Sequence, residues 1–357
     1  MPRTLHAHLR LNKEYGLKGP PSHAESGECR FIRGDFMKNA LLKLIAIATV
    51  LVAGLTAAQA QITAGPNRPA TVPSGYLITP FGYFHPSCVA QLAEGDELRP
   101  DDHVIRHPNG SSSNMHVCAY PHYRANGDKV VGDERAAKDP NISHAWIEYA
   151  SVTTTSSYGF LYAFWSVPPT PTSKDGQTLF FFPGLEDIND VVTIIQPVLG
   201  WNSDYASAWG IASWNCCVSG TTYEGPPQPV SPGDTILGYM FDTCAAGTLS
   251  CGSWDIVTWD LQNGMFSELL NTSSFGQTFN WAFGGVLEVY NIKQCTDYPS
   301  NGGYPGSHAI SFDNIGLYND NFVQIAEPNW SVSNISGGLT PQCSYGGSLP
   351  AQVILTY

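Results

Sequence analysis

The sequence predicts an all-β protein built as an antiparallel sandwich. After Pro140, short runs rich in Val, Ile, Thr, Tyr, Phe and Trp follow at close spacing, separated by Gly, Pro, Asn and Ser. Many runs alternate, so that one face packs and the other is free to line a groove. No amphipathic helix longer than a turn or two is evident there. The expected strands are 144–152, 159–167, 178–182, 191–198, 207–213, 235–241, 254–260, 277–290 and 352–356.

The sequence from residue 61 onward divides into two parts near residue 140. Residues 61–140 are rich in Pro, Asn, Asp and Gly, and the run His107-Pro108-Asn109-Gly110 is a strong loop signal. Only 75–78 and 116–120 resemble short strands. This part is too small and too polar for an independent domain. We therefore predict a loop-rich N-terminal segment at 61–140 and a β-sandwich domain at 141–357.

Residues 37–60 have the pattern of a secretory signal peptide. Lys38 and Lys43 stand at the head of an apolar run, which ends at the small-residue cleavage site Ala58-Gln59-Ala60. The run is too short to span a bilayer permanently. We expect a secreted protein, extracellular or periplasmic, with no membrane attachment after signal removal. Residues 1–36 are interpreted as an upstream leader from a mis-assigned start; the alternative is a cytosolic extension before a buried helix.

Cysteine usage agrees with export. Cys29 lies in the leader, and the eight remaining cysteines form an even set, as expected of disulfides in an oxidising compartment. We expect three pairs, Cys88 with Cys118, Cys244 with Cys251, and Cys295 with Cys343, and leave open whether Cys216 pairs with Cys217. No Cys-x-x-Cys pair recurs at zinc-ligand spacing, so no structural metal is predicted.

Charge is distributed unevenly along the chain. Residues 141–357 contain two basic residues, Lys174 and Lys293, against 17 acidic ones. Once its carboxylates are protonated below about pH 4, such a domain carries little charge of either sign and avoids the self-repulsion that unfolds ordinary proteins in acid. We therefore predict acid adaptation, although a merely soluble acidic surface is the alternative. A nucleic-acid partner is disfavoured and is not predicted, because residues 141–357 carry no basic footprint.

The familiar catalytic motifs are absent from residues 141–357. The two histidines, His144 and His308, do not lie near a Gly-x-Ser-x-Gly turn, and no His-Glu-x-x-His, Walker or Gly-x-Gly-x-x-Gly motif occurs. Oxidised cysteines are poor nucleophiles. Glu186, Gln196 and Glu288, however, each interrupt or end an apolar strand, which costs a few kcal/mol unless the polar group is paired. An outward-facing position would explain any one of them, but three together favour a site.

Six motifs occur in the order of a known family. They are Ser143-His144-Ala145-Trp146; Tyr162 to Pro168, ending in Val-Pro; Phe182-Pro183-Gly184-Leu185-Glu186, similar to Trp-x-Gly-Ile-Asp; Ile194-Ile195-Gln196-Pro197-Val198, similar to Ile-Leu-Gln-Thr-Gly; the Gly233-Asp234 turn; and Val286-Leu287-Glu288-Val289-Tyr290, similar to Ile-Val-Glu-Asp-Phe. The series resembles the glutamic peptidases, chiefly the eqolisin group and more loosely the neprosin-type group. It covers about residues 141–300.

The resemblance implies a concanavalin- or lectin-like jelly roll, a catalytic dyad of Gln196 and Glu288, and no cofactor. Glu288 would take a proton from an attacking water and return it to the leaving amine. Gln196 would donate its amide N–H to the developing oxyanion, an interaction worth about 3 kcal/mol. The chemistry needs neither a metal nor a covalent intermediate, and a carboxylate base suits acidic pH.

Two departures leave alternatives open. Glu186 stands where the family has Asp, so it can orient Glu288, share a proton with it, or replace Gln196 in a two-glutamate dyad of the neprosin type. Asn215-Cys216-Cys217 interrupts a strand that is rich in aromatic residues in the family. The substrate-binding residues that we expect are Trp201, Tyr205 and Trp209. A core position accounts for each tryptophan equally well.

We thus predict a monomeric, acid-acting endopeptidase of protein or peptide substrates, with residues 61–140 as its inhibitory propeptide. Basic residues of the propeptide would hold it against the acidic domain at neutral pH. The rivals are a lectin-like carbohydrate- or surface-binding module and a glycoside hydrolase that uses Glu186 and Glu288. A peptidase predicts Gln196 and Glu288 within hydrogen-bonding reach, whereas a glycosidase predicts two carboxylates about 5–10 Å apart.

Overall fold

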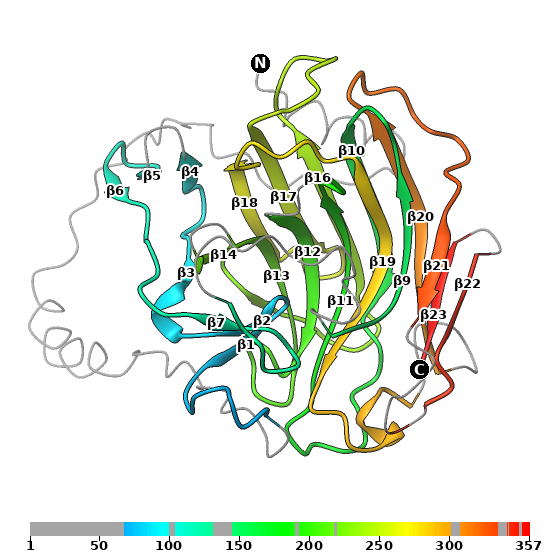
Figure 1. Cartoon of the computed structure of the whole chain (residues 1–357). Helices are drawn as coiled ribbons and strands as arrows, with labels where there is room; N and C mark the ends of the chain where they lie inside the picture. Colours follow the sequence, from blue (N-terminus) through cyan, green and yellow to red (C-terminus); the bar gives the residue numbers. More distant parts are fainter. Residues whose placement is uncertain are drawn as a thin grey trace, which may run out of the picture. The chain divides into compact units, whose positions relative to one another are not determined.

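The chain is an all-β sandwich in the computed structural model (Figure 1). The structure describes residues 68–99, 104–130, 145–189, 193–217, 220–300, 308–334, 341, 343–349 and 352–357. The predicted leader and signal peptide, residues 1–60, lie outside the described residues. Short 3-10 turns occur at Pro86–Cys88 and Cys295–Asp297. In the described part of the chain, no helix is long and apolar enough to cross a membrane.

One sheet of the sandwich has nine strands. In spatial order they are β21 (Ser331–Asn334), β9 (Trp146–Thr153), β19 (Trp281–Tyr290), β11 (Thr178–Glu186), β12 (Ile194–Trp201), β13 (Trp209–Cys216), β14 (Thr222–Glu224) and β3 (Val89–Gln91), with β15 (Gln228–Pro229) also paired to β13. The four strands β19, β11, β12 and β13 are buried along their whole length. Burial on both faces explains why their sequences are nearly continuous apolar runs.

The second sheet has ten strands, and a small third sheet has four. The ten are β22 (Gly346–Ser348), β23 (Val353–Thr356), β20 (Ala309–Asn319), β10 (Tyr158–Ser166), β16 (Thr235–Asp242), β17 (Ser253–Asp260), β18 (Phe266–Ser273), β4 (Glu97–Arg99), β5 (Val104–Arg106) and β6 (Ser112–Asn114). The four are β1 (Leu77–Thr79), β2 (Gly82–Phe84), β7 (His122–Tyr123) and β8 (Lys129–Val130).

The two faces of the nine-stranded sheet pack against different partners. Its odd-numbered side chains on β11, such as Phe181, meet Trp165 and Phe312 of the ten-stranded sheet in the core of the sandwich. Its even-numbered side chains, such as Phe180, belong instead to a cluster with residues 72–84 of the N-terminal segment. We call this second side the covered face. Side chains alternate with a period of two along a regular strand, so on β11 and β12 the even-numbered residues lie on the covered face.

The N-terminal segment is built into both sheets. Its β3 runs parallel to β14 at the edge of the nine-stranded sheet, and its β4 runs parallel to β18 in the ten-stranded sheet. It is therefore more ordered than the predicted loop-rich chain. The expected strand at 116–120 is wrong: these residues are not in a strand, Val117 is exposed, and strands occur at 112–114 and 122–123 instead.

A β-bulge in β19 lies next to the site. Gly184 pairs with Phe283, but Phe182 pairs with Val286, so β19 carries one extra residue, at Gly284–Gly285. The intervening Pro183 has no N–H to donate to β19, which is the physical reason for an interrupted ladder at this point.

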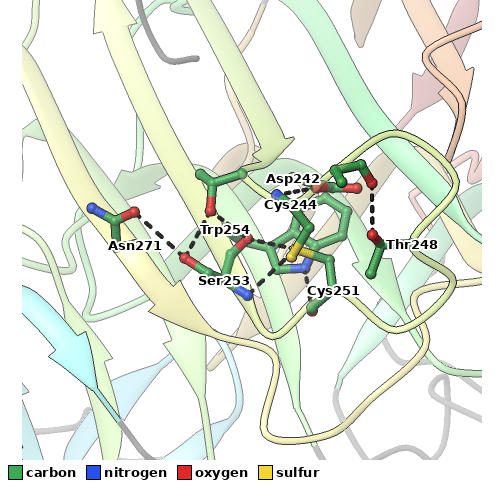
Figure 2. The surroundings of a disulfide bond; sticks show 9 residues. Asp242, Cys244, Thr248, Cys251, Ser253, Trp254 and Asn271 are labelled. Atoms are coloured by element: carbon green, nitrogen blue, oxygen red, sulfur yellow. Dashed lines mark hydrogen bonds between the residues drawn. A yellow bond between two sulfur atoms is a disulfide. The ribbon is translucent and has the colours of Figure 1, made fainter. Parts of the chain in front are cut away.

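Four disulfides join the eight cysteines of the described chain. Three are the pairs expected from the sequence, and the fourth joins Cys216 to Cys217. Figure 2 shows the Cys244–Cys251 bridge with Asp242 beside it, whose carboxylate accepts from the Cys244 N–H at 2.6 Å. These three residues have the proximity of metal ligands, but both sulfurs are consumed by the bridge. Four disulfides fit a protein of an oxidising compartment.

Candidate active site

Gln196 lies in the middle of the covered face. It pairs with Trp214 on β13, and Trp214 pairs in turn with Glu224 on β14. On the other side, the register of β11 with β12 brings Gly184 beside it. The Gln196 side chain is fully buried, and neither its amide nitrogen nor its oxygen has a hydrogen-bond partner in the described structure. A buried amide without partners is costly, and it is available to a ligand that supplies both.

Glu288 lies on the covered face of β19 and is held by two donors. The indole Nε1 of Trp146 donates to Oε2 at 2.9 Å, and the hydroxyl of Tyr290 donates to Oε1 at 2.5 Å. The carboxyl group is fully buried. Burial raises the pKa of Glu288 well above its ordinary value, and the two donors oppose this rise because they stabilise the carboxylate.

Gln196 and Glu288 share a face but do not touch. Glu288 pairs with Phe180, and Phe180 pairs with Gly200, which lies four residues from Gln196 along β12. Their backbones are therefore separated by about 10 Å across two strand spacings and about 13 Å along the strands. The expectation that they lie within hydrogen-bonding reach is wrong for this structure. The part of the covered face between Gln196 and Glu288, which β11 crosses, is called the interval below.

Glu186 is close to Gln196 and far from Glu288. Glu186 ends β11, and its side chain lies on the covered face. It lies two residues beyond Gly184, the residue opposite Gln196, so this diagonal pair is about 7–8 Å apart. Burial raises the pKa of Glu186 to about 8. Glu186 pairs with Trp281, whereas Glu288 pairs with Phe180, six residues earlier on β11. Six residues of strand correspond to about 20 Å between Glu186 and Glu288. That separation exceeds the one between Gln196 and Glu288 and does not fit the glycosidase pair, which needs about 5–10 Å.

Two of the three predicted substrate-binding residues face the wrong way. Trp201 and Trp209 pair with each other, and both side chains lie in the core between the two sheets, each 1% exposed. Their odd numbers place them opposite Gln196 on the strand. Tyr205 is half-buried in the β12–β13 turn and packs over Gly210, with its hydroxyl donating to the Pro227 carbonyl at 3.0 Å.

The N-terminal segment covers the interval between Gln196 and Glu288. The ring of Phe81 meets the edge of Trp214, beside Gln196, with 6.4 Å between ring centroids. The ring of Tyr83 meets Tyr290, beside Glu288, at 5.5 Å. A backbone hydrogen bond also joins Gly82 to the Tyr290 hydroxyl. Three consecutive residues of the segment thus connect the surroundings of the two candidate catalytic groups.

A further pair of acidic side chains lies on the covered face and was not predicted. Asp204, from the β12–β13 turn, hydrogen-bonds side chain to side chain with Glu224, and Ser203 donates to Asp204 at 2.8 Å. Burial raises the pKa of both carboxyl groups, and the Asp204 charge raises that of Glu224 further. When one of the two carboxyl groups is protonated, it donates the hydrogen bond to the other and the repulsion between two negative charges is avoided. The sequence signal that was available was Glu224 in a short β-rich run.

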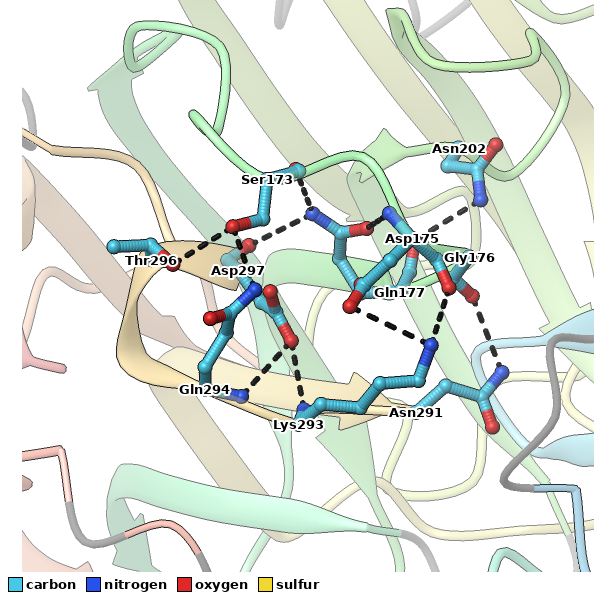
Figure 3. Close-up of polar contacts among 10 residues, drawn as sticks. All are labelled: Ser173, Asp175, Gly176, Gln177, Asn202, Asn291, Lys293, Gln294, Thr296 and Asp297. Atoms are coloured by element: carbon cyan, nitrogen blue, oxygen red, sulfur yellow. Dashed lines mark hydrogen bonds and ion pairs between the residues drawn. The ribbon is translucent and has the colours of Figure 1, made fainter.

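Polar contacts anchor the end of β19 that carries Glu288. Figure 3 shows Lys293, which follows β19. The Lys293 ammonium donates to the backbone carbonyl of Asp175 at 2.7 Å and forms an ion pair with the Asp175 carboxylate at 3.4 Å. Asp297 accepts from the Lys293 and Gln294 backbone N–H groups at 2.7 and 3.1 Å. Gln177, just before β11, donates to the Asp297 carbonyl at 3.2 Å. These contacts fix the chain immediately beyond the Glu288–Phe180 pair.

Comparison with known proteins gives structural matches only. Scytalido-glutamic peptidase, solved with a peptide-based transition-state analogue, is 15% identical with a TM-score of 0.43, covering 59% of this chain and 98% of its own. SCP-B, a member of the eqolisin family of peptidases solved with the tripeptide Ala-Ile-His, is 15% identical with a TM-score of 0.41, covering 60% and 98%. No family model and no curated protein sequence matches the chain.

Proposed function

We propose that the chain is a secreted, acid-acting endopeptidase, with a β-sandwich catalytic domain at 141–357 and residues 61–140 as its inhibitory propeptide. One observation carries the proposal. Phe81 and Tyr83 of the N-terminal segment pack against Trp214, the neighbour of Gln196, and against Tyr290, the hydrogen-bond partner of Glu288. A peptide hydrolase has to hold a peptide beside its catalytic groups, and this segment is held in that position.

Glu288 supplies the base in this proposal. Trp146 and Tyr290 fix its carboxyl group, and departure of the segment admits water to it. Solvation then lowers the pKa of Glu288 toward its ordinary acidic range, because desolvation was the main cause of the rise. The carboxylate takes a proton from the attacking water and later delivers it to the leaving amine.

Gln196 supplies the oxyanion contact. Its unpartnered amide N–H donates to the oxygen on which negative charge develops. In the structure the two groups lie too far apart to act on one carbonyl, so the proposal requires them to approach each other when the segment leaves and a substrate binds. Glu186 is protonated in acid because its pKa is about 8, so it is placed near Gln196 as a proton donor.

The placement of the disulfides supports the propeptide assignment. The Cys88–Cys118 bridge lies inside the segment and the other three lie inside the domain, so cleavage between residues 131 and 144 severs the covalent link. The contacts that hold the segment are largely apolar and aromatic. They do not match the electrostatic latch that charge alone predicted. Burial raises the pKa of Glu268 in the domain to about 7, and the like charge of Glu94 in the segment adds to this rise.

The lectin-like alternative loses its main support in the structure. That reading needed exposed tryptophans on a binding surface, and Trp201 and Trp209 are buried between the sheets.

Digestion of an unfolded protein substrate between pH 2 and 8, after cleavage of the segment, tests the proposal. Glu288→Gln is expected to remove activity, and Gln196→Ala to lower it by about a hundred- to a thousand-fold. Glu327→Gln, at an exposed carboxylate, is the matched control and should leave activity unchanged. Wild-type rates in Glu288→Gln would refute the assignment of the base, and absence of cleavage at every pH by the processed wild type would refute the peptidase.

A further inference from the structure

The hairpin formed by β1 and β2 lies on the covered face in the position that a substrate would take. Leu77 pairs with Phe84 and Thr79 with Gly82, so the turn falls at Pro80-Phe81. Phe81 and Tyr83, two residues apart, both join the cluster of the covered face. Phe84 turns away and stacks on His122 within the segment, with centroids 4.7 Å apart.

Each of the two rings is received by an aromatic residue of the domain. Trp214 receives Phe81 edge-on at an interplanar angle of 69°, and Tyr290 receives Tyr83 at 79°. Both geometries are the favoured T-shaped kind, worth about 0.5–1.5 kcal/mol beyond the burial of area. Trp214 is the cross-strand neighbour of Gln196, and the Tyr290 hydroxyl donates a hydrogen bond to Glu288.

We propose that the same two positions are substrate subsites, and that they select peptides with aromatic side chains two residues apart around the scissile bond. The inference rests on the proposed function and adds the substrate class. Trp214 forms the subsite on the Gln196 side, and Tyr290 forms the subsite on the Glu288 side. The Phe81 and Tyr83 side chains belong to one cluster, and in a substrate strand the side chains at positions i and i+2 likewise share a side, so they reach both subsites at once.

The backbone at Gly82 explains why the hairpin is a cover and not a substrate. Gly82 has φ of +118°, a conformation that other residues rarely adopt. A Cβ atom there would lie 2.2 Å from the Tyr123 carbonyl oxygen. Gly82 is therefore held in a conformation that a substrate residue with a side chain does not adopt.

Cleavage of synthetic twelve-residue peptides by the acid-processed wild type tests the selection. The set has Phe and Tyr at i and i+2, Ala at either or both positions, or the same two aromatics adjacent. We expect the spaced aromatic pair to be cleaved at least ten-fold faster than the double-Ala and adjacent-pair peptides. Trp214→Leu should reduce the preference at the Phe position and leave that at the Tyr position. Equal cleavage across the set overturns the inference and leaves the peptidase proposal intact.

Binding gives a readout that does not depend on catalysis. The full chain carrying Phe81→Ala, Tyr83→Ala and Glu288→Gln is titrated with a fluorescent peptide of residues 75–86 and with its double-Ala version. At least ten-fold tighter binding of the aromatic peptide is expected, and equal binding overturns the subsites. Tight aromatic binding together with no cleavage by any processed form refutes the peptidase and supports the subsites. Thermal unfolding of each variant verifies that it is folded.

Discussion

Tyr290 donates a 2.5 Å hydrogen bond to Glu288, two residues before it on the same face of β19. The same hydroxyl is bonded to the backbone of Gly82 in the N-terminal segment. Tyr290 therefore links the candidate base to the peptide that covers it. Its donation stabilises the carboxylate form and lowers the pKa of Glu288 against the effect of burial.

Replacing Tyr290 by Phe removes this donor and keeps the ring that contacts Tyr83. We expect the pKa of Glu288 to rise, so the acid limb of the activity profile should move up by about one pH unit in the processed enzyme. The alkaline limb and the melting temperature at pH 4 should change little. The pH profile of kcat/KM checks this, with Tyr318→Phe on β20 as the control. An unmoved acid limb would show that Tyr290 does not tune the base.

Glu148 contributes most to stability in acid. It is fully buried, and burial raises the pKa of Glu148 to about 8, although backbone groups of Gly346 and Thr356 oppose the rise. The folded state therefore binds a proton that the unfolded chain releases near its ordinary value of 4.5. Its contribution is fully present below about pH 4.5 and is lost as the pH rises toward 8.

Thermal unfolding between pH 3 and 9 should show this dependence. Wild type is expected to lose stability from pH 4.5 to 8, and Glu148→Gln, which cannot ionise, should flatten that part of the curve. Glu186 has a pKa raised to about 8 and Glu268 to about 7, so they act in the same direction and leave a residual slope. A wild-type melting temperature that increases from pH 4.5 to 8 would contradict the prediction.

His122 gives the N-terminal segment a dependence of the opposite sign. It stacks on Phe84, and burial, together with the charge of Arg124, lowers the pKa of His122 to about 4. The neutral ring is favoured in the fold, so its contribution is present above about pH 6.5 and is lost as the pH falls through 4. Acid therefore loosens the sheet that covers Glu288 while it stabilises the domain.

Hydrogen exchange of the β1, β2, β7 and β8 amides, corrected for intrinsic rates, measures this effect. Protection should fall between pH 6.5 and 4 in wild type. In His122→Asn, which does not titrate, the fall should be smaller, while amides of β11 and β12 serve as internal controls. Identical pH profiles for the two proteins would exclude His122 as the cause.

The sequence predicted the central strands well because burial on both faces leaves a clear apolar pattern. Each of the nine expected runs overlaps a strand of the structure. Two long strands were missed, β18 and β20, since polar residues such as Glu268 and Asp313 interrupt their alternation and give the pattern of a loop. Pairing with neighbours, which a single sequence does not display, makes them strands.

The site was predicted unevenly for a physical reason. Alternation along one strand could have assigned Trp201 to the far face, because it lies an odd number of residues from Gln196. The distance between Gln196 and Glu288, in contrast, depends on the register of three strands and on the bulge at Gly284–Gly285. Neither the strand register nor the bulge can be predicted from the local sequence alone. The role of Trp214 depends on the same registers.

Gly82 provides the sharpest test that the hairpin is what covers the site. Gly82→Ala forces a Cβ atom against the backbone of Tyr123, at 2.2 Å, in a conformation of φ +118°. The hairpin must move, so the uncleaved chain should gain activity toward a peptide substrate, by at least ten-fold. The covering contacts of Phe81 and Tyr83 are expected to be lost together.

Gly75→Ala is the matched control, because Gly75 also has a positive φ, +87°, but nothing within 4 Å of its Cβ position. It should cost only about 1 kcal/mol of backbone strain and leave the uncleaved chain inactive. Activity is measured on the same substrate at pH 4 before any processing, and gel electrophoresis verifies that the segment is still attached. Equal latency of the two variants would show that the hairpin does not control access to Glu288, even if the domain is a peptidase once processed.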